Sequence, residues 1–283
     1  MIKYLSKVIT FLLFLSGFYG FSSLFSSGHA QVVYIDETNG CVEPGGIILT
    51  DKPFSDFKID LDQKVLYIIP VPVTATLLED FRICEKDFPV EHINVRIRKK
   101  RKVSGEDDLA ERIKEQKAFL KSLYLREPLP KMWEGNFVFP LRNYKSVKDN
   151  FGARRVINGV SGPIHRGIDI SANKGEKVYA SNSGIVVVAR RFVLEGNLIV
   201  INHGTGIHTI YAHLKDMAVK EGDFVKKGQL IGYVGSTGRS TGYHLHFGAK
   251  IGQVDINPYA LFEIQNVLSV ALGNFDKLKN LEN

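Results

Sequence analysis

The chain has 283 residues, of which 44% are hydrophobic, and its formal net charge is +7 at pH 7. This length and apolar content are enough for a buried core in one compact domain or in two modest ones. After residue 30, no stretch approaches the roughly 20 apolar residues that a membrane-spanning helix needs, which excludes such a helix there.

The first thirty residues have the layout of a secretory signal peptide. Lys3 and Lys7 precede an apolar run at Val8–Leu15. The small residues Gly28 and Ala30 then occupy the two positions that a signal peptidase recognises. We therefore expect cleavage after Ala30, and the alternative is an uncleaved N-terminal anchor. Either arrangement places the rest of the chain outside the cytoplasm, in the periplasm or cell envelope.

The N-terminal part contains both cysteines, Cys41 and Cys84. Because an exported chain meets an oxidising compartment, a single disulfide between them is one interpretation, and two unrelated thiols are the other. Neither cysteine belongs to a CxxC pair, so a zinc site built from thiolates is not expected.

A run of cationic side chains lies at 96–102. In an exported protein this run favours weak contact with anionic polymers or membrane surfaces over binding to nucleic acid. A solvated end of a strand is an equally good interpretation.

Residues 31–102 predict a small β-sandwich-like domain, because short alternating or β-branched runs are separated by turn residues. The predicted strands are Val32–Ile35, Ile47–Leu49, Phe57–Leu61, Val65–Ile69 and Ile93–Ile97.

The segment 103–132 is predicted to be a helical linker. Its helix runs from Glu106 to Leu125 because apolar residues recur there at helical spacing, and Pro128 and Pro130 follow its end. The helix either packs one apolar stripe on a neighbouring domain or covers a functional groove.

Residues 133–262 give the strongest strand signal in the chain and predict antiparallel hairpins, followed by a helical tail at 263–283. The fold class is therefore mostly β. The predicted strands are Lys177–Ala180, Gly184–Ala189, Asn197–Asn202, Thr209–His213, Gln229–Val234 and His244–Lys250.

Six of the eight histidines crowd between residues 165 and 246. His165 and Asp169 are four residues apart, and Gly167 with its β-branched neighbours predicts a strand on which all three point to one face. Gly167 would keep the space between the two polar side chains open. In the same way, His244 and His246 share one face of a later strand, so polar side chains are expected to line a cleft.

Two imidazoles and one carboxylate form a three-ligand site that leaves one zinc position free, which is typical of catalytic zinc. The sequence contains no HExxH motif, so no glutamate on a helix serves as the base. Imidazole titrates near neutral pH, and His213 and His244 fit the role of base or oxyanion donor. Which of them has which role is left open.

These residues together resemble the M23 family, the LytM/lysostaphin-type zinc metallopeptidases. The resemblance covers roughly 133–262, and the segment before it carries no motif that we can assign. The motifs that carry it are Phe151–Arg155 (FGARR), His165-x-x-x-Asp169, Tyr211–Leu214 (YAHL), the glycine-rich turn Gly235–Gly242 and His244–Phe247 (HLHF).

The resemblance implies a small antiparallel β domain with a long open groove, in which His165, Asp169 and His246 bind Zn²⁺ while His213 and His244 assist catalysis. It also implies peptidoglycan as the substrate, cut in stem peptides or cross-bridges by an endopeptidase. Two alternatives remain: a non-catalytic wall-binding scaffold that activates an amidase, and an exported peptidase that acts on proteins. The N-terminal domain or the predicted helix is expected to restrain access to the groove.

Other polar residues near these motifs have less definite roles. His203 and His208 belong to a glycine-rich hairpin turn, and we expect both to be surface residues. Arg154, Arg155 and Asn158 either contact substrate or shape the loop that precedes the first motif.

Overall fold

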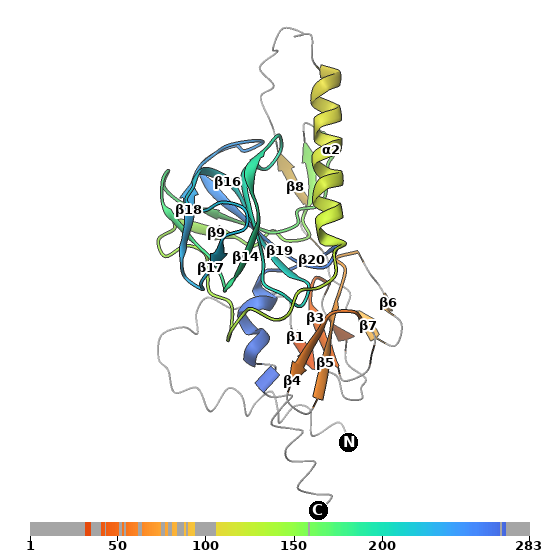
Figure 1. Ribbon diagram of the computed structural model, residues 1–283. Coiled ribbons are helices and arrows are strands. Elements are labelled where there is room, and N and C mark those ends of the chain that lie inside the picture. The colour runs from red at the N-terminus through yellow and green to blue at the C-terminus, as the bar shows by residue number, and fades with distance from the viewer. Residues whose placement is uncertain are drawn as a thin grey trace, which may run out of the picture.

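The computed structural model describes most of the chain between residues 32 and 269 (Figure 1). The described residues are 32–34, 41–42, 44–50, 53, 55–61, 64–74, 77–78, 81–83, 88, 90–93, 106–157, 159–266 and 268–269. The predicted signal peptide, the basic run at 96–102, Cys84 with its predicted disulfide, Asn158 and residues 270–283 lie outside them. Among the described residues, no helix is long and apolar enough to cross a membrane.

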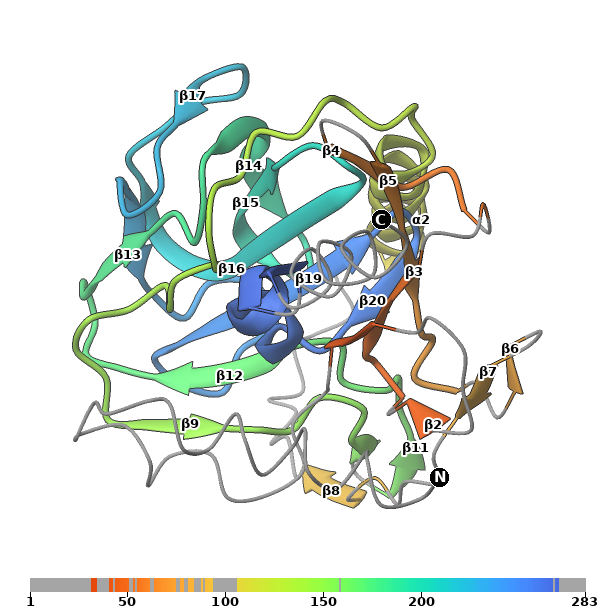
Figure 2. The ribbon, with the colours of Figure 1, turned by 90° about the horizontal axis from the view of Figure 1, so that it is seen from below.

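A large antiparallel sheet forms the C-terminal half of the chain (Figures 1 and 2). Its main path is β17–β14–β15–β16–β19–β12–β9, while β18 pairs with both β16 and β13, and β20 pairs with β19. All six strands predicted for this half overlap an observed strand, and the mostly β fold class is confirmed. The strands are β9 (Ser146–Lys148), β12 (Ile168–Ser171), β13 (Lys177–Tyr179), β14 (Gly184–Phe192), β15 (Gly196–Asn202), β16 (Ile207–Met217), β17 (Phe224–Val225), β18 (Leu230–Val234), β19 (His244–Ile251) and β20 (Val254–Ile256).

Two small sheets come from the N-terminal part. One has the order β1–β3–β5–β4, with β1 parallel to β3, and the other has the order β2–β7–β6. Their strands are β1 (Val32–Tyr34), β2 (Cys41–Val42), β3 (Ile47–Thr50), β4 (Lys58–Leu61), β5 (Lys64–Pro70), β6 (Leu77–Leu78) and β7 (Phe81–Ile83).

Strand β8 (Val90–Ile93) joins neither of these two sheets. It pairs in parallel with β10 (Arg154–Ile157), which in turn pairs with β11 (Val160–Ser161). The predicted strand around residue 93 was placed with the N-terminal β domain, whereas β8 lies beside the loop that carries the FGARR motif. Parallel strands need a long crossover, and the chain between β8 and β10 supplies one.

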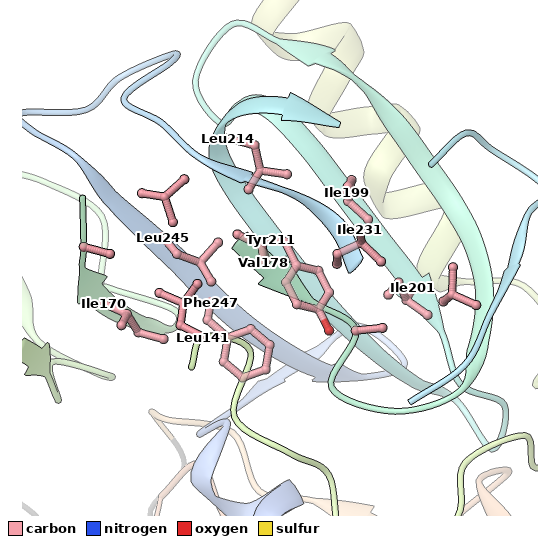
Figure 3. Close-up of a cluster of buried hydrophobic side chains, with 14 of the residues drawn as sticks. Leu141, Ile170, Val178, Ile199, Ile201, Tyr211, Leu214, Ile231, Leu245 and Phe247 are labelled. Carbon is pink, nitrogen blue, oxygen red and sulfur yellow. The ribbon is translucent and has the colours of Figure 1, made fainter. Parts of the chain in front are cut away.

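The paired strands β13 and β18 cover one face of the large sheet. Tyr211, Leu245 and Phe247 point from this face into a cluster that also contains Val178 and Ile231, and all five are fully buried (Figure 3). Each such side chain contributes about 1.5–3 kcal/mol through burial of apolar surface. Because side chains alternate along a strand, the residues between them point to the opposite face.

The opposite face of the sheet carries helix α2 (Glu106–Tyr124). Leu123 and Tyr124 are buried there, and their partners on the sheet are Val188, Phe192, Leu198, Val200 and Ala212. Ala212 lies directly across from His246 in the pairing of β16 with β19, so α2 packs on the face that carries His246. The apolar stripe of the predicted helix therefore packs on a neighbouring sheet.

The N-terminal sheet and the large sheet share one apolar cluster. Ile47 and Leu66 from the N-terminal sheet are fully buried together with Ile207 and Ile251 of the large sheet. Figure 2 shows β3 and β5 beside β20. Residues 259–266 form a helix, whose Leu261 enters the same cluster.

Candidate metal centre and active site

The pairing of β12 with β19 brings Asp169 directly across from His246. The neighbouring residues Ile168, Ile170 and Leu245 are each 0% exposed and point into the core. The predicted alternation on these two strands is therefore confirmed, and it places a carboxylate and an imidazole side by side on the open face.

His165 reaches the same place without belonging to the strand. The sequence predicted one strand through His165, Gly167 and Asp169, but β12 begins only at Ile168. The His165 backbone N–H donates to the Ala153 carbonyl at 2.9 Å. The loop that carries the FGARR motif therefore positions His165, whose ring is 1% exposed.

The three side chains converge on one point. Asp169 Oδ1 lies 3.2 Å from His165 Nε2 and 2.9 Å from His246 Nδ1, and these two nitrogens are 3.0 Å apart. One ligand atom from each residue lies within 4.8 Å of the others. Two imidazoles and a carboxylate at such separations fit a single tetrahedral metal ion with one open position.

Gly167 provides the space that this convergence needs. A Cβ atom at this position would lie 2.9 Å from His246 Cε1 and 2.5 Å from the Phe247 carbonyl oxygen. Such distances are shorter than van der Waals contact, so any larger residue would push the His246 ring. Gly167 thus leaves room for the His246 ring, whereas the sequence predicted that it keeps open the space between His165 and Asp169.

Hydrogen bonds on the far side of the ligands fix which atoms face the centre. His165 Nδ1 donates to the Asn150 carbonyl at 3.0 Å, so Nε2 faces the centre. Asp169 Oδ2 accepts from Asn150 Nδ2 at 3.4 Å and from Arg155 Nη2 at 3.3 Å, so Oδ1 faces the centre. Partners of this kind orient metal ligands in proteins, so the donor set fits a metal ion.

The charge states of the ligands also suit a metal. Burial lowers the pKa of His165, so its ring is neutral near pH 7. Burial opposes ionisation of Asp169, but hydrogen bonds with His165 and His246 outweigh it and lower the pKa of the carboxyl well below its usual range. A neutral imidazole and an ionised carboxylate are the forms that bind metals.

A bulge in β16 aims His213 at this centre. Between the pairs Ile199–Tyr211 and Asn197–Leu214, β16 has one residue more than β15. His213 has φ = 62°, a left-handed conformation that is uncommon outside glycine and is often found at functional sites. Tyr211 and Leu214 therefore both enter the core, while His213 turns to the open face.

His213 and His244 are held by the glycine-rich turn at 235–242. His213 Nδ1 donates to the Thr237 carbonyl at 2.8 Å, and His244 Nδ1 donates to the Gly242 carbonyl at 3.0 Å. Their ring centroids are 4.9 Å apart, and His244 Nε2 lies 3.8 Å from Asp169 Oδ1. Burial lowers the pKa of His213 to about 4, which keeps its ring neutral near pH 7.

The structure brings together all five histidine and aspartate positions predicted from the motifs. Four rings and one carboxylate surround a common space. Such an arrangement can hold one metal ion and can exchange a proton with a water or a substrate beside it.

His203 and His208 are not surface residues, so that prediction is wrong. Their exposed fractions are 0% and 4%. His203 Nδ1 donates to the Ser183 carbonyl at 2.8 Å, and its Nε2 lies 2.7 Å from Thr209 Oγ1. The His208 ring packs edge-on against Tyr124 of α2. The N-terminal sheet and α2 bury the hairpin that the sequence alone presents as an exposed turn.

The residues Asn150 and Glu91 were missed by sequence reasoning. Asn150 lies just before the FGARR motif, and Glu91 belongs to β8, far from any motif of the site. Arg155 contacts Asp169 and Glu91, which gives it a structural role in the loop, whereas Arg154 is exposed.

Comparisons with known proteins agree with this geometry. "DD-carboxypeptidase/endopeptidase Mpg" of Neisseria meningitidis is 38% identical over 128 residues, which are 45% of this chain and 30% of the relative. "Peptidoglycan DD-endopeptidase ShyC" of Vibrio cholerae is 36% identical over 141 residues, which are 49% and 29%. Lysostaphin of Staphylococcus staphylolyticus is 43% identical over 109 residues, which are 38% and 22%. The chain thus covers less than a third of the length of these relatives.

A solved structure extends the comparison to the fold. The crystal structure of a putative peptidase M23 from Pseudomonas aeruginosa matches with a TM-score of 0.53 at 18% identity, over 77% of this chain and 93% of that one. Residues 163–258, which contain Asp169, His213 and His246, match Peptidase family M23. Residues 163–258, which form most of the large antiparallel sheet, therefore match a domain of peptidase family M23.

Proposed function

We propose that this chain is a zinc metalloendopeptidase that hydrolyses peptide bonds in the stem peptides or cross-bridges of peptidoglycan. The observation that carries the proposal is the convergence of His165 Nε2, Asp169 Oδ1 and His246 Nδ1 within 4.8 Å. The names of the relatives support the substrate, since two of them are peptidoglycan DD-endopeptidase and DD-carboxypeptidase/endopeptidase.

His165, Asp169 and His246 would hold the Zn²⁺ ion. When bound, Zn²⁺ supplies Lewis acidity that polarises a carbonyl group and makes a water nucleophilic near neutral pH. Arg155 and Asn150 hold Oδ2 of Asp169, so Oδ1 would be the atom available to the ion.

His213 and His244 would manage the proton and the developing negative charge. Each ring donates Nδ1–H to a backbone carbonyl, so Nε2 is the atom that faces the reacting groups. A neutral Nε2 accepts a proton from the attacking water, and a protonated Nε2 donates a hydrogen bond to the oxyanion. The two roles are distributed between His213 and His244, in an order that the geometry leaves open.

The proposed place of action is the periplasm or cell envelope. The signal-peptide pattern at residues 1–30 supports export, and a substrate in the cell wall requires it. The basic run at 96–102 would add weak attraction to anionic wall polymers or membrane surfaces.

Digestion of purified peptidoglycan tests the function. The protein is incubated with sacculi and, separately, with casein, after treatment with a chelator and again after addition of Zn²⁺. We expect zinc-dependent release of muropeptides with cleaved peptides. Cleavage of casein without loss of sacculi would instead support a peptidase that acts on proteins. Zinc binding with no cleavage of either substrate would support a wall-binding scaffold or amidase activator.

A further inference from the structure

Glu91 is the one described residue of β8 whose side chain is shown to reach the neighbourhood of the candidate metal ligands. Strand β8 precedes the region that matches the peptidase family, and it pairs in parallel with β10 so that Glu91 lies directly across from Arg155. Nearby, the Phe88 ring packs so closely on Gly152 that no Cβ would fit there. The segment around β8 is thus packed against the FGARR loop, which positions His165.

Three donors converge on the Glu91 carboxylate, which is 8% exposed. Arg155 Nε donates to Oε2 at 3.3 Å, Asn150 Nδ2 donates to Oε1 at 3.0 Å, and Lys148 forms an ion pair with Oε1. Burial opposes ionisation of this carboxyl, but the three hydrogen bonds outweigh it and lower the pKa of Glu91. A buried carboxylate with this many partners holds each of them in a defined place.

Two of the same donors also hold Asp169. Arg155 contacts Glu91 through Nε and Asp169 through Nη2, so its planar guanidinium bridges the two carboxylates. The Asn150 amide likewise faces both carboxylates with its NH₂ group, which settles its orientation, because its oxygen would be repelled there. The third donor, Lys148, lies across from Asp169 in the pairing of β12 with β9.

We propose that Glu91 is a positioning residue for the metal centre, acting through Arg155 and Asn150 on Asp169. It anchors the two donors at the distance where they hold Oδ2 and leave Oδ1 for the metal. This inference rests on the proposed zinc site, and it makes the segment before the peptidase region part of that site.

The test is the affinity for Zn²⁺, measured by competition with a chromophoric chelator on the purified protein, for wild type and Glu91→Gln. We expect Zn²⁺ to bind about ten- to a hundredfold more weakly to the variant, as is usual when an outer partner of a ligand is lost. The matched control is Glu221→Gln, because Glu221 likewise accepts a hydrogen bond from an arginine Nε, that of Arg190, while its hydrogen bonds and ion pair within the described part of the chain involve no residue of the centre. The control is expected to bind Zn²⁺ like wild type.

A double-mutant comparison separates positioning from general stability. In an Arg155→Gln background, Glu91→Gln is expected to weaken Zn²⁺ binding much less than it does in wild type, because the two residues act in series. If Glu91→Gln does not fold, Arg155→Lys gives the same test, since a single ammonium keeps the charge but cannot bridge two carboxylates. It too is expected to bind Zn²⁺ more weakly.

Equal Zn²⁺ affinity in Glu91→Gln and wild type, or equal weakening in both backgrounds, would overturn the proposal. Either result would leave the proposed function intact if wild type still cleaves peptidoglycan. Conversely, a wild type that binds Zn²⁺ more tightly than Glu91→Gln but leaves sacculi whole would refute the proposed substrate and keep the role of Glu91. A wild type that binds no Zn²⁺ would refute both.

Discussion

Three imidazoles of the site are fixed by hydrogen bonds from Nδ1 to backbone carbonyls. A carbonyl is rigid and is present at every residue, so it fixes the tautomer and the ring orientation without any particular side chain. The rings are therefore in place before a metal or a substrate arrives, which lowers the cost of binding. The pairs are His165 with Asn150, His213 with Thr237 and His244 with Gly242, at 3.0, 2.8 and 3.0 Å.

Gly167→Ala is expected to weaken Zn²⁺ binding at least tenfold. The new Cβ would lie 2.9 Å from His246 Cε1, and the Phe247 carbonyl on its other side belongs to the rigid strand β19. The His246 ring must therefore move, and its Nδ1 moves with it. Competition with a chelator measures the change.

Gly242→Ala is the control for this substitution. Nothing lies within 4 Å of a Cβ at Gly242, and its φ is not positive. We expect this variant to keep the wild-type affinity for Zn²⁺. Equal affinities for wild type and Gly167→Ala would show that the crowding at His246 does not matter.

At the scale of single residues, the sequence predicts which side chains gather at the site when they are of a type that can bind metal and recur at a regular spacing. His165, Asp169, His244 and His246 are recognisable because imidazole and carboxylate recur at strand spacing, and the choice of His246 as the ligand rests on the resemblance to the M23 family. Glu91 and Asn150 are not recognisable, because a glutamate in a short strand has many ordinary roles, and nothing in the chain shows that β8 will pair with β10. His203 and His208 were misplaced because burial of a hairpin depends on distant segments.

At the scale of secondary-structure elements, α2 is held on the open face of the sheet by apolar side chains near its C-terminal end. Leu123 is 4% exposed and packs against the sheet, whereas Leu125, just after the helix, is 60% exposed. Gln116 Oε1 also accepts a hydrogen bond from the Val193 N–H at 2.9 Å. The helix thus contacts β14 and the chain that follows it.

Leu123→Ala is expected to lower the free energy of unfolding by about 2–5 kcal/mol, the usual cost of a cavity in a core. Leu125→Ala is expected to change it by less than about 0.5 kcal/mol, because its side chain is in solvent. Urea denaturation of both variants measures the difference. Similar small effects of the two substitutions would mean that α2 is not packed on the sheet in solution.

The regular elements could be predicted, because local patterns specify them: the strands of the large sheet follow alternation, and α2 follows helical spacing. Their partners could not be predicted in the same way. β8 and β10 are separated by more than fifty residues along the chain. Because parallel strands are not joined by a tight turn, no local turn sequence indicates that the two will pair. The bulge that turns His213 to the open face likewise could not be predicted, because β16 contains no glycine that would indicate a left-handed residue there.

Removal of everything before Trp133 distinguishes two predictions about the N-terminal segment. If this segment only covers the groove, the truncated chain should digest peptidoglycan faster than the full chain. The contacts of the N-terminal segment with the large sheet and with the FGARR loop predict that the truncated chain digests peptidoglycan more slowly. Truncation removes Glu91 and exposes Ile207 and Ile251, which the N-terminal sheet buries. We therefore expect weaker Zn²⁺ binding and lower activity, measured on the soluble fraction of each protein.

At the scale of the whole molecule, two buried histidines make stability depend on pH. Burial lowers the pKa of His203 to about 3 and that of His208 to about 4, from an ordinary value of 6.5. Below pH 6.5 the unfolded chain binds protons that the folded chain does not. Stability is therefore fully present above pH 6.5 and is lost as pH falls toward 4, by up to about 1.4 kcal/mol per pH unit for each histidine.

His203→Gln is expected to reduce this slope by up to about 1.4 kcal/mol per pH unit, because glutamine does not titrate. Urea denaturation of the metal-free protein between pH 7 and pH 4.5, in a chelator, gives the slope without any contribution from metal release. A slope identical to that of wild type would show that His203 is not buried in its neutral form.

The most direct test of the proposed metal centre compares zinc content and muropeptide release in wild type, His246→Ala and His213→Ala. We expect about one zinc ion per chain and cleaved peptides for wild type, and loss of both for His246→Ala. We expect His213→Ala to keep its zinc and to lose activity by about 10²–10⁴-fold, the usual contribution of a general acid or base. A wild type that binds zinc and leaves every sacculus intact, or a His213→Ala protein that cleaves as well as wild type, would contradict the proposed function and the proposed role of His213.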